Sequence, residues 1–232
     1  MRLDKLLANK AYGSRKKVHQ IIKDRRVTIN GEVTTKKDIH INIDIDTVAV
    51  DGQTVNTTQL YYVKFHKPKG YVTAVEDSSH PIVMDLLPPE YLKMGVVPVG
   101  RLDKDTEGLL LLTNDGVWGH SIINGHKHVP KVYYVEFEGE LSEEGIQRIK
   151  EGIVLGDETQ CKPALIELLS DQSATITIEE GKYHQVKRMI GAAGGSVTYL
   201  KRLTIGHVDL SGIEEVGSVM DLTIDEIEGF KK

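Results

Sequence analysis

Four consecutive leucines, Leu109 to Leu112, constrain the fold of this chain more than any other feature. Successive side chains of a β-strand point to opposite faces, so an unbroken apolar run cannot leave one face in water. We therefore expect this segment to be a strand that is buried on both faces. With 232 residues, the chain is long enough to enclose such a strand in a sizeable core.

A polar turn, residues 100–108, connects the strand-like Val96–Val99 to the leucine run. It contains Asp103, and an ionisable group beside a buried strand faces a low dielectric, where a charge needs a partner or shifts its pKa. Arg101, two residues earlier, is one candidate partner. Catalytic carboxylates are often held in this way. The alternative is an ordinary surface turn, because Asp, Thr and Gly are common turn formers.

Charge is unevenly distributed along the chain, which carries a formal net charge of −5 at pH 7. Residues 1–37 contain 11 Lys and Arg against 3 Asp and Glu, a balance of +8. Residues 38–232 contain the other 18 against 31, a balance of −13. Local potential decides whether phosphates are attracted, so the basic end indicates a polyanion-binding module. A solvated basic helix face is the alternative.

Bulk composition excludes several classes of protein. No apolar run approaches the roughly 18 residues that a membrane span needs, and the segment from Met1 to Lys5 lacks an apolar export signal. The single cysteine, Cys161, rules out an internal disulfide and suits a reducing compartment. We therefore expect a cytoplasmic protein with no membrane partner. His126 and His128 have no third ligand at useful spacing, so we expect no metal site there.

The basic end predicts two short helices followed by hairpins. Aliphatic residues recur at helical spacing over residues 3–7 and again over 18–22, and Ser14 is placed to cap the second helix. Asn30-Gly31 and Asp51-Gly52 are signals for two-residue hairpin turns. This pattern predicts a small RNA-docking module with its basic side chains exposed.

The polar, unpatterned residues 56–59 mark a linker, so we expect one domain over residues 1–58 and another over 59–232. Strands outnumber helices in the second domain and do not alternate with them regularly. This favours an α+β domain on a mainly antiparallel mixed sheet with flanking helices, not a doubly wound parallel fold. The acidic segment 209–228 is expected to be a solvated surface. Strands are expected at 61–65, 71–74, 96–99, 109–112, 132–137, 164–169 and 174–179, and helices at 117–123, 142–151 and 184–193.

A long motif surrounds Asp103. Gly100-Arg101-Leu102-Asp103, followed by Thr106, Gly108 and the run to Gly116, resembles the signature loop of the pseudouridine synthases, and most closely the RsuA-type family that modifies ribosomal RNA. In that family the Asp of the Arg-Leu-Asp triplet is the essential residue, which implies the same role for Asp103. The amino-terminal arrangement is similar to the S4 domain, which reads RNA shape and backbone.

Two further segments match the same family. The family's Lys-x-Tyr strand corresponds to Lys131–Phe137, which implies that Tyr133 packs beside the target uracil. The segment from Tyr183 to Met189 places the family's basic partner of the catalytic Asp at Lys187, and it looks more like the small-subunit enzyme than its large-subunit relatives. His66 departs from the family's Asn-Lys-Pro-x-Gly pattern, which puts in doubt any contact made by the Asn side chain.

The resemblance implies an isomerase that breaks the N1–C1′ bond of a uridine, turns the freed uracil and rejoins it through C5, with no cofactor. Asp103 acts either as nucleophile at C1′ or as base at C2′, and the sequence does not decide between them. The implied partner is small-subunit (16S) ribosomal RNA, at position 516, within an assembling subunit, and we expect a monomer. The alternatives are a large-subunit (23S) enzyme and a non-catalytic RNA-binding ribosome-assembly factor.

The candidate site residues fall into two groups. The catalytic group is Asp103, Tyr133, Lys187 and Arg101. The group expected to contact RNA is basic or polar and consists of Arg2, Lys5, Arg15, Lys16, Lys17, Arg25, Arg26, Lys67, Lys69, His184, Gln185 and Arg188.

Overall fold

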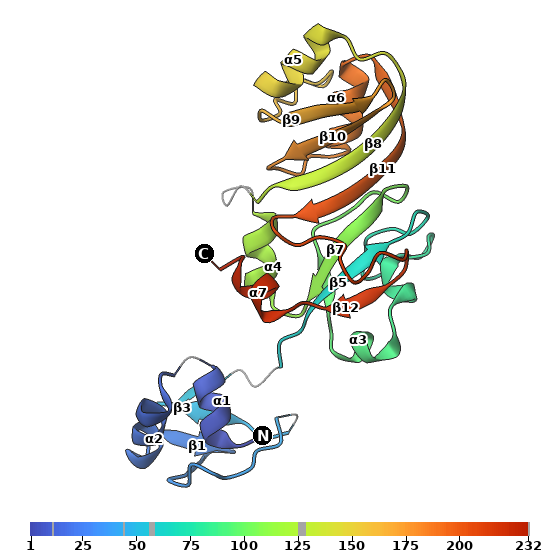
Figure 1. Ribbon diagram of the computed structural model, residues 1–232. Helices are drawn as coiled ribbons and strands as arrows, with labels where there is room; N and C mark the ends of the chain where they lie inside the picture. Colours follow the sequence, from blue (N-terminus) through green and yellow to red (C-terminus); the bar gives the residue numbers. More distant parts are fainter. Residues whose placement is uncertain (11, 44, 56–58, 125–128, 232) are drawn as a thin grey trace. The chain divides into compact units, whose positions relative to one another are not determined.

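The computed structural model describes residues 1–10, 12–43, 45–55, 59–124 and 129–231. The chain divides into a smaller unit, Met1–Gln59, and a larger unit, Leu60–Lys232 (Figure 1). The expected domain limits at residues 58 and 59 remain predictions. Most of the expected linker, with His126 and His128, lies outside the described residues. Within the described ranges, no helix is both long and apolar enough to cross a membrane.

The smaller unit combines two helices with a four-stranded antiparallel sheet. Ser14 caps the second helix, since its Oγ accepts a hydrogen bond from the Lys17 backbone N–H at 3.4 Å. Asn30-Gly31 and Asp51-Gly52 have positive φ at both positions, as the predicted hairpin turns require. The sheet order is β2-β1-β3-β4. The elements are α1 (Leu3–Asn9), α2 (Arg15–Lys23), β1 (Val27–Ile29), β2 (Glu32–Val33), β3 (Val48–Val50) and β4 (Gln53–Thr54).

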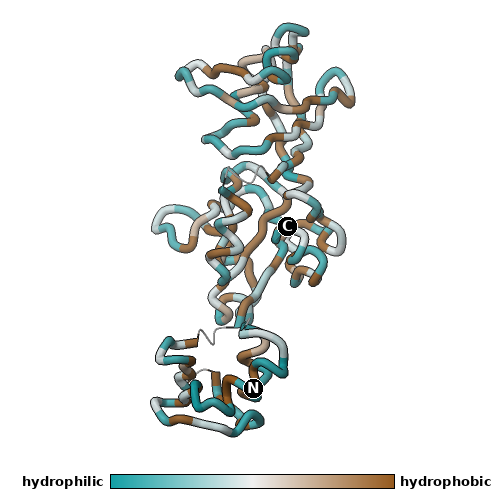
Figure 2. The backbone as a smooth tube through the Cα atoms, turned by 90° about the vertical axis from the view of Figure 1, so that its left-hand side faces the viewer, coloured by the Kyte–Doolittle hydropathy of each residue, from teal (hydrophilic) through white to brown (hydrophobic). Residues whose placement is uncertain are grey.

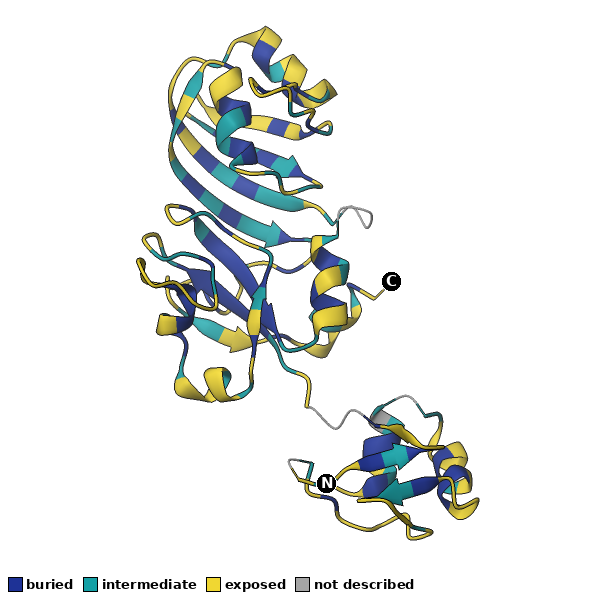
Figure 3. Cartoon of the chain, turned by 180° about the vertical axis from the view of Figure 1, so that it is seen from behind, coloured by how far each residue is buried: buried dark blue, intermediate teal, exposed yellow. Residues whose placement is uncertain are grey.

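Burial separates the apolar from the basic residues of this unit (Figure 3). Val18, Ile21 and Ile22 of α2 are buried, as their helical spacing predicts. They join a core that also contains the leucines of α1. All seven basic residues that the sequence assigns to RNA contact in this unit are exposed, namely Arg2, Lys5, Arg15, Lys16, Lys17, Arg25 and Arg26.

An eight-stranded sheet forms the larger unit, in the order β12-β5-β7-β11-β8-β10-β9, with β6 paired to β7. Only the β7–β11 pairing is parallel among these described strands, which confirms the expected mainly antiparallel α+β fold. The strands are β5 (Tyr62–Lys67), β6 (Val97–Val99), β7 (Glu107–Thr113), β8 (Lys131–Gly139), β9 (Leu165–Ser170), β10 (Ser173–Ile178), β11 (Gly195–Ile205) and β12 (Val219–Asp221). The helices are η1 (Val83–Leu86), α3 (Pro89–Lys93), α4 (Gly116–Ile123), α5 (Glu143–Glu151), α6 (Gln185–Ala192) and α7 (Ile224–Glu228).

Strand β7 carries the four leucines through the sheet, and all four are fully buried. Leu110 and Leu112 belong to the large hydrophobic cluster that contains Tyr133. Leu109 and Leu111 belong to a separate cluster with Trp118. Each pair therefore packs into a different core, and the strand is buried on both faces as predicted. Figure 2 shows hydrophobic segments, in brown, running through the middle of the larger unit.

The strand prediction fails in places where local sequence is a poor guide. Residues 71–74 form only an isolated bridge between Val72 and Ile82. The longest described strand, β11, is missing from the sequence prediction. Its exposed and half-buried positions are largely polar, so β11 lacks a clear apolar period and depends on pairing with β8 and β7.

The acidic segment 209–228 is largely solvated, as its charge predicts, because all of its carboxylates except that of the half-buried Glu226 are exposed. It contains β12 and α7 and buries Ile213 and Leu222. Glu226 of α7 accepts a hydrogen bond from Nζ of the buried Lys64 on β5 at 2.7 Å. A cation on the neighbouring strand therefore compensates one of the carboxylates and ties the segment to the sheet.

Candidate active site

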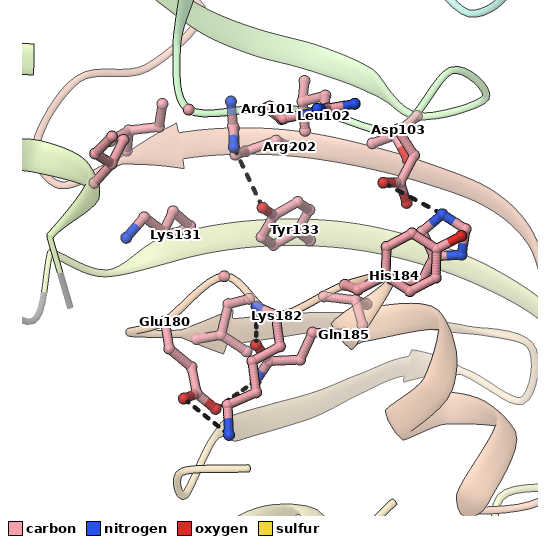
Figure 4. Close-up of a pocket in the computed structure, with 18 of the residues that line it drawn as sticks. Arg101, Leu102, Asp103, Lys131, Tyr133, Glu180, Lys182, His184, Gln185 and Arg202 are labelled. Carbon is pink, nitrogen blue, oxygen red and sulfur yellow. Dashed lines mark hydrogen bonds and ion pairs between the residues drawn. The ribbon is translucent and has the colours of Figure 1, made fainter. Parts of the chain in front are cut away.

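A cavity of about 370 Å³ lies over β8 and β11 of the larger unit. The polar turn before β7 supplies Asp103, β8 supplies Tyr133, β11 supplies Arg202, and the residues before α6 supply His184 (Figure 4). These residues are brought together from positions about 100 apart in the sequence by the pairing of β7, β11 and β8.

Asp103 and Glu180 are the carboxylates that line the cavity, and the two oxygens of Asp103 face different basic side chains. Lys187 Nζ lies 3.2 Å from Oδ2, and His184 Nε2 lies 3.6 Å from Oδ1. The Asp103 side chain remains 30% exposed, so it is open to a ligand in the cavity. Of the two candidate partners suggested by sequence, the structure pairs Lys187 with Asp103. The exposed Arg101 makes no ion pair with Asp103 in the described part of the chain.

Lys187 binds a second carboxylate as well, that of Asp105, with its Nζ 2.5 Å from Oδ1. Burial alone would lower the pKa of Lys187, but the hydrogen bond to Asp105 and the charge of Asp103 outweigh it and raise the pKa. Burial also acts to raise the pKa of Asp105, yet the Lys187 contact lowers it overall. Lys187 is therefore a persistent cation beside Asp103.

Lys67 is not available for the RNA contact that the sequence predicts. Its side chain is fully buried at the end of β5, and its Nζ donates hydrogen bonds to backbone carbonyl oxygens of the Asp103 turn. The distances are 3.1 Å to Asp103 and 2.8 Å to Thr106, with a further bond of 2.9 Å to Pro68. The prediction that Lys67 meets phosphate is therefore wrong. This lysine anchors the turn that presents Asp103.

Tyr133 and Arg202 form the floor of the cavity. Tyr133 is 8% exposed and shares the buried face of β8 with Val135 and Phe137, as the strand pattern predicts. Arg202 lies opposite it on β11, and its Nη1 donates to the Tyr133 hydroxyl at 3.4 Å. Sequence reasoning missed Arg202, because its strand was itself not predicted.

Gly108 allows β7 and β11 to approach closely enough to build this floor. Its φ is +114°, and a Cβ there would lie 2.2 Å from the backbone oxygen of Arg202. Any side chain at this position would therefore push the two strands apart. The close packing of β7 against β11 thus explains why the sequence motif has a glycine at this position.

Residues near α6 that the sequence assigns to RNA contact have different surroundings. Gln185 is buried, donates to Glu180 Oε1 at 2.8 Å and accepts from the Lys182 backbone N–H at 3.0 Å. Its side chain holds the loop instead of reaching out to RNA, so that prediction is wrong. Arg188 pairs with Asp157, not with Asp103.

His184 and Lys69 keep surroundings compatible with RNA contact. His184 has a left-handed backbone, with φ 48°, and its ring stacks on the exposed Tyr183 ring with centroids 3.8 Å apart. Exposed Lys69 lies over the Tyr199 ring, with its Nζ 4.1 Å from the centroid. RNA contact by these two residues stays a prediction. Across the described ranges, no group of three or more His, Cys, Asp or Glu could hold a metal ion.

Two protein-family models match this chain. A family model described as RNA pseudouridylate synthase matches residues 61–192, and an S4 domain model matches residues 1–41. This chain belongs to the RNA pseudouridylate synthase family. The family confirms the expected isomerase class and the expected order of an S4 domain followed by a synthase domain.

Relatives match the synthase along nearly its whole length. An uncharacterized RNA pseudouridine synthase of Bacillus subtilis (strain 168), YtzG, is 43% identical over 231 residues, which cover 98% of this chain and 97% of the relative. The ribosomal small subunit pseudouridine synthase A of Escherichia coli (strain K12) is 36% identical, covering 98% of both chains. A crystal structure of a pseudouridylate synthase superposes with a TM-score of 0.69 at 35% identity over 99% of both chains.

Proposed function

We propose that this synthase isomerises one uridine of small-subunit (16S) ribosomal RNA, at position 516, to pseudouridine, and that Asp103 acts on the ribose. The observation that carries the proposal is the position of Asp103, a carboxylate held by Lys187 at 3.2 Å in the same cavity that Tyr133 lines. A carboxylate beside an aromatic floor provides an acidic group for the sugar and a surface for the base.

The target base must leave its stack before it can enter a cavity of this kind, at a cost of a few kcal/mol. Tyr133 then packs against the uracil, and stacking of a base on an aromatic ring offsets about 1–3 kcal/mol of that cost. The Tyr133 hydroxyl is fixed by Arg202 at 3.4 Å, so the ring is oriented before the base arrives. Such pre-orientation lowers the entropy lost on binding.

Asp103 reacts in its ionised form, either as nucleophile at C1′ or as base at C2′. The ion pair with Lys187 and the anchoring of the turn by Lys67 fix where the carboxylate points. The reaction is an isomerisation, so atoms and electrons balance within the uridine and no redox partner is needed.

The smaller unit supplies affinity for the RNA backbone. Its exposed Lys5, Arg15, Lys16, Lys17 and Arg25 have no ion pair in the part of the chain that the structure describes. They are therefore available to neutralise phosphates, which makes binding dependent on salt. Arg2 and Arg26 pair instead with Asp4 and Asp51 at 2.7 and 2.5 Å.

The choice of small-subunit RNA is supported by relatives that are named as ribosomal small subunit synthases and match this chain over its full length. It is also supported by the segment Tyr183–Met189, which looks more like that enzyme than its large-subunit relatives. We place the reaction in the cytoplasm, on an assembling subunit, with the synthase as a monomer.

Mapping of pseudouridines in ribosomal RNA from cells that lack this gene tests the proposal. We expect one small-subunit pseudouridine to vanish, to return with the wild-type gene and to stay absent with Asp103→Asn. Loss of a large-subunit site instead would identify a 23S enzyme. An unchanged map, with the chain still bound to ribosomal RNA, would identify a non-catalytic assembly factor.

A further inference from the structure

Neither Arg202 nor Lys131 of the cavity forms a salt bridge with a carboxylate within the described chain, although the charge of the exposed Glu179 acts on Lys131. Arg202 is 4% exposed, and Lys131, two residues before Tyr133 on β8, is half-buried. Burial lowers the pKa of Lys131, the charge of Arg202 lowers it further, and the charge of Glu179 opposes this only in part. Two like charges thus lie near one another inside the same cavity, and this arrangement favours the binding of an anion there.

The lack of a counter-ion is clearest for Arg202. Its Nε donates to the Leu109 carbonyl oxygen at 2.7 Å, and its Nη1 donates to the Tyr133 hydroxyl at 3.4 Å. Its Nη2 is buried and has no hydrogen-bond partner within the described residues. A buried charge without a counter-ion lowers stability. Such a group is typical of a functional site, where the charge is needed at another stage.

Figure 4 shows how these charges are arranged around Tyr133, with Asp103 to one side of the ring and Lys131 to the other. Lys131 and Tyr133 are two residues apart on one strand, so their side chains leave the same face about 7 Å apart. The cavity therefore has a carboxylate at one end, an aromatic floor in the middle and a cation at the far end.

A uridine that is positioned for the proposed reaction can lie along the cavity in only one orientation. Its ribose lies at Asp103 and its uracil lies over Tyr133, so the edge of the uracil away from the sugar points toward Lys131. When the C1′–N1 bond breaks, its electron pair goes to N1 and spreads onto the uracil oxygens. Negative charge therefore moves from the carboxylate end of the cavity to the cationic end.

We propose that Lys131 is a catalytic residue that stabilises the detached uracil anion, and that Arg202 is a positioning residue that orients Tyr133 and adds positive potential. This rests on the proposed function. Asp103 meanwhile bonds to C1′ or takes the C2′ proton. The C1′–C5 bond then forms, Asp103 is released or returns its proton, the C5 proton leaves to solvent, and N1 takes up a proton from solvent. Fixed charges aimed at developing charge are a major source of catalysis.

A phosphate of the same RNA is the other anion that could occupy the cationic end. The structure favours the base, because Lys131 lies beside the aromatic floor in the cavity, whereas phosphates of an everted nucleotide remain with the backbone. The two sources predict different kinetics. A contact to the leaving base acts on the chemical step, and a contact to phosphate acts on binding and its salt dependence.

A contact to the base and a contact to a phosphate can be separated by single-turnover kinetics. The substrate is an RNA that carries either uridine or 4-thiouridine at the target position. The 4-thio base is more acidic than uracil and needs less help as a leaving group. We expect Lys131→Met to slow conversion of uridine about 10- to 100-fold, with the RNA dissociation constant changed less than about threefold. The loss should be clearly smaller with 4-thiouridine, and Lys131→Arg should retain most of the rate.

Lys201→Met is the matched control, because Lys201 precedes Arg202 on β11, faces the opposite side of the sheet and pairs with Glu107 at 3.5 Å. It should behave as wild type on both bases. Arg202→Met should show the same leaving-group pattern as Lys131→Met, provided its near-ultraviolet circular dichroism is native.

Equal losses on uridine and 4-thiouridine would overturn the proposal. Weaker RNA binding with a salt slope reduced by about one would assign Lys131 to a phosphate and would overturn it as well. A wild-type protein that converts neither substrate would instead contradict the proposed function, so the two failures are distinguishable.

Discussion

The basic residues of the smaller unit lie on its surface, whereas those around the active site lie inside the larger unit. Arg15, Lys16 and Lys17 are exposed on α2. Lys67 and Arg202 are buried and bind backbone carbonyl oxygens. The same side-chain types therefore serve two purposes. Exposed cations attract a phosphate backbone at long range, and buried cations shape one turn and one cavity.

The difference follows from the cost of removing a charge from water. An exposed cation keeps its hydration, so it can be replaced or moved with little effect on folding. A buried cation must recover its lost hydration from fixed partners, and Lys67 does so with carbonyls of the turn that carries Asp103. Substitutions in the two units should therefore fail in different ways, one in RNA binding and the other in chemistry or folding.

The largest effect is expected for Asp103→Asn, which removes the reactive carboxylate and leaves the shape of the cavity unchanged. We expect the single-turnover rate of pseudouridine formation to fall by about 1,000-fold or more. Asp105→Asn is the matched control, because Asp105 binds the same Lys187 but is 72% exposed outside the cavity lining. Comparable losses in both variants would show that the Lys187 cluster, not Asp103 itself, limits the reaction.

Lys67→Met should destabilise the larger unit by about 2–4 kcal/mol, because it leaves buried carbonyl oxygens of the Asp103 turn without donors. Chemical denaturation measures the change. Lys69→Met, two residues away, removes only an exposed cation over Tyr199 and should cost less than about 1 kcal/mol. Equal stability of the two variants would contradict the anchoring role.

The pH dependence of stability gives a second test of Lys67. Burial lowers its pKa from 10.5 to about 8, so between these values the unfolded chain binds a proton that the folded chain has released. The free energy of unfolding of wild type relative to Lys67→Met should therefore rise with pH across this window, by at most about 3 kcal/mol. A difference that is flat or falls between pH 7 and pH 10 would show that Lys67 is not desolvated.

Lys187→Met should slow the chemical step about 10- to 100-fold, because Asp103 loses the cation 3.2 Å from its Oδ2. The dissociation constant for RNA should change much less. Arg188→Met, the next residue on α6, removes a cation that pairs with Asp157 and should leave the rate near that of wild type. A larger loss with Arg188→Met than with Lys187→Met would refute the assigned pairing.

The smallest effect per residue is expected on the surface of α2. Replacing Arg15, Lys16 and Lys17 together by Gln should weaken RNA binding several-fold at low salt and flatten its salt slope by up to about 2–3, with the single-turnover rate at saturating enzyme preserved. A matched triple of exposed cations in the larger unit should change neither quantity, namely Lys93, Arg148 and Lys150. An unchanged salt slope would remove the smaller unit from RNA binding.

Sequence reading succeeded where the determinants are local. Ser14, the two hairpin turns and the leucine run each specify their own structure within a few residues, and all form as predicted. Sequence-based prediction failed where pairing with strands distant in the sequence determines the structure. Strand β11 is held by β8 and β7, so the sequence of β11 alone does not reveal Arg202.

The sequence also did not predict which charged and polar side chains are buried. The sequence shows Lys67 as a loop lysine beside Pro68, and nothing local indicates that four carbonyl oxygens converge on its Nζ. Likewise, Gln185 reads as an exposed polar residue at a helix start, but Glu180 and Lys182 enclose it. Which polar groups are exposed is a property of the assembled sheet, not of residue type.

The most direct test of how the cavity works is a crystal structure of the Asp103→Asn protein bound to a fragment of its target RNA. We expect the target uridine to be everted, with C1′ beside residue 103, the uracil on Tyr133 and the far edge of the base at Lys131. A target uridine that stays stacked in the RNA, or a base bound outside this cavity, would contradict the roles proposed for all three residues.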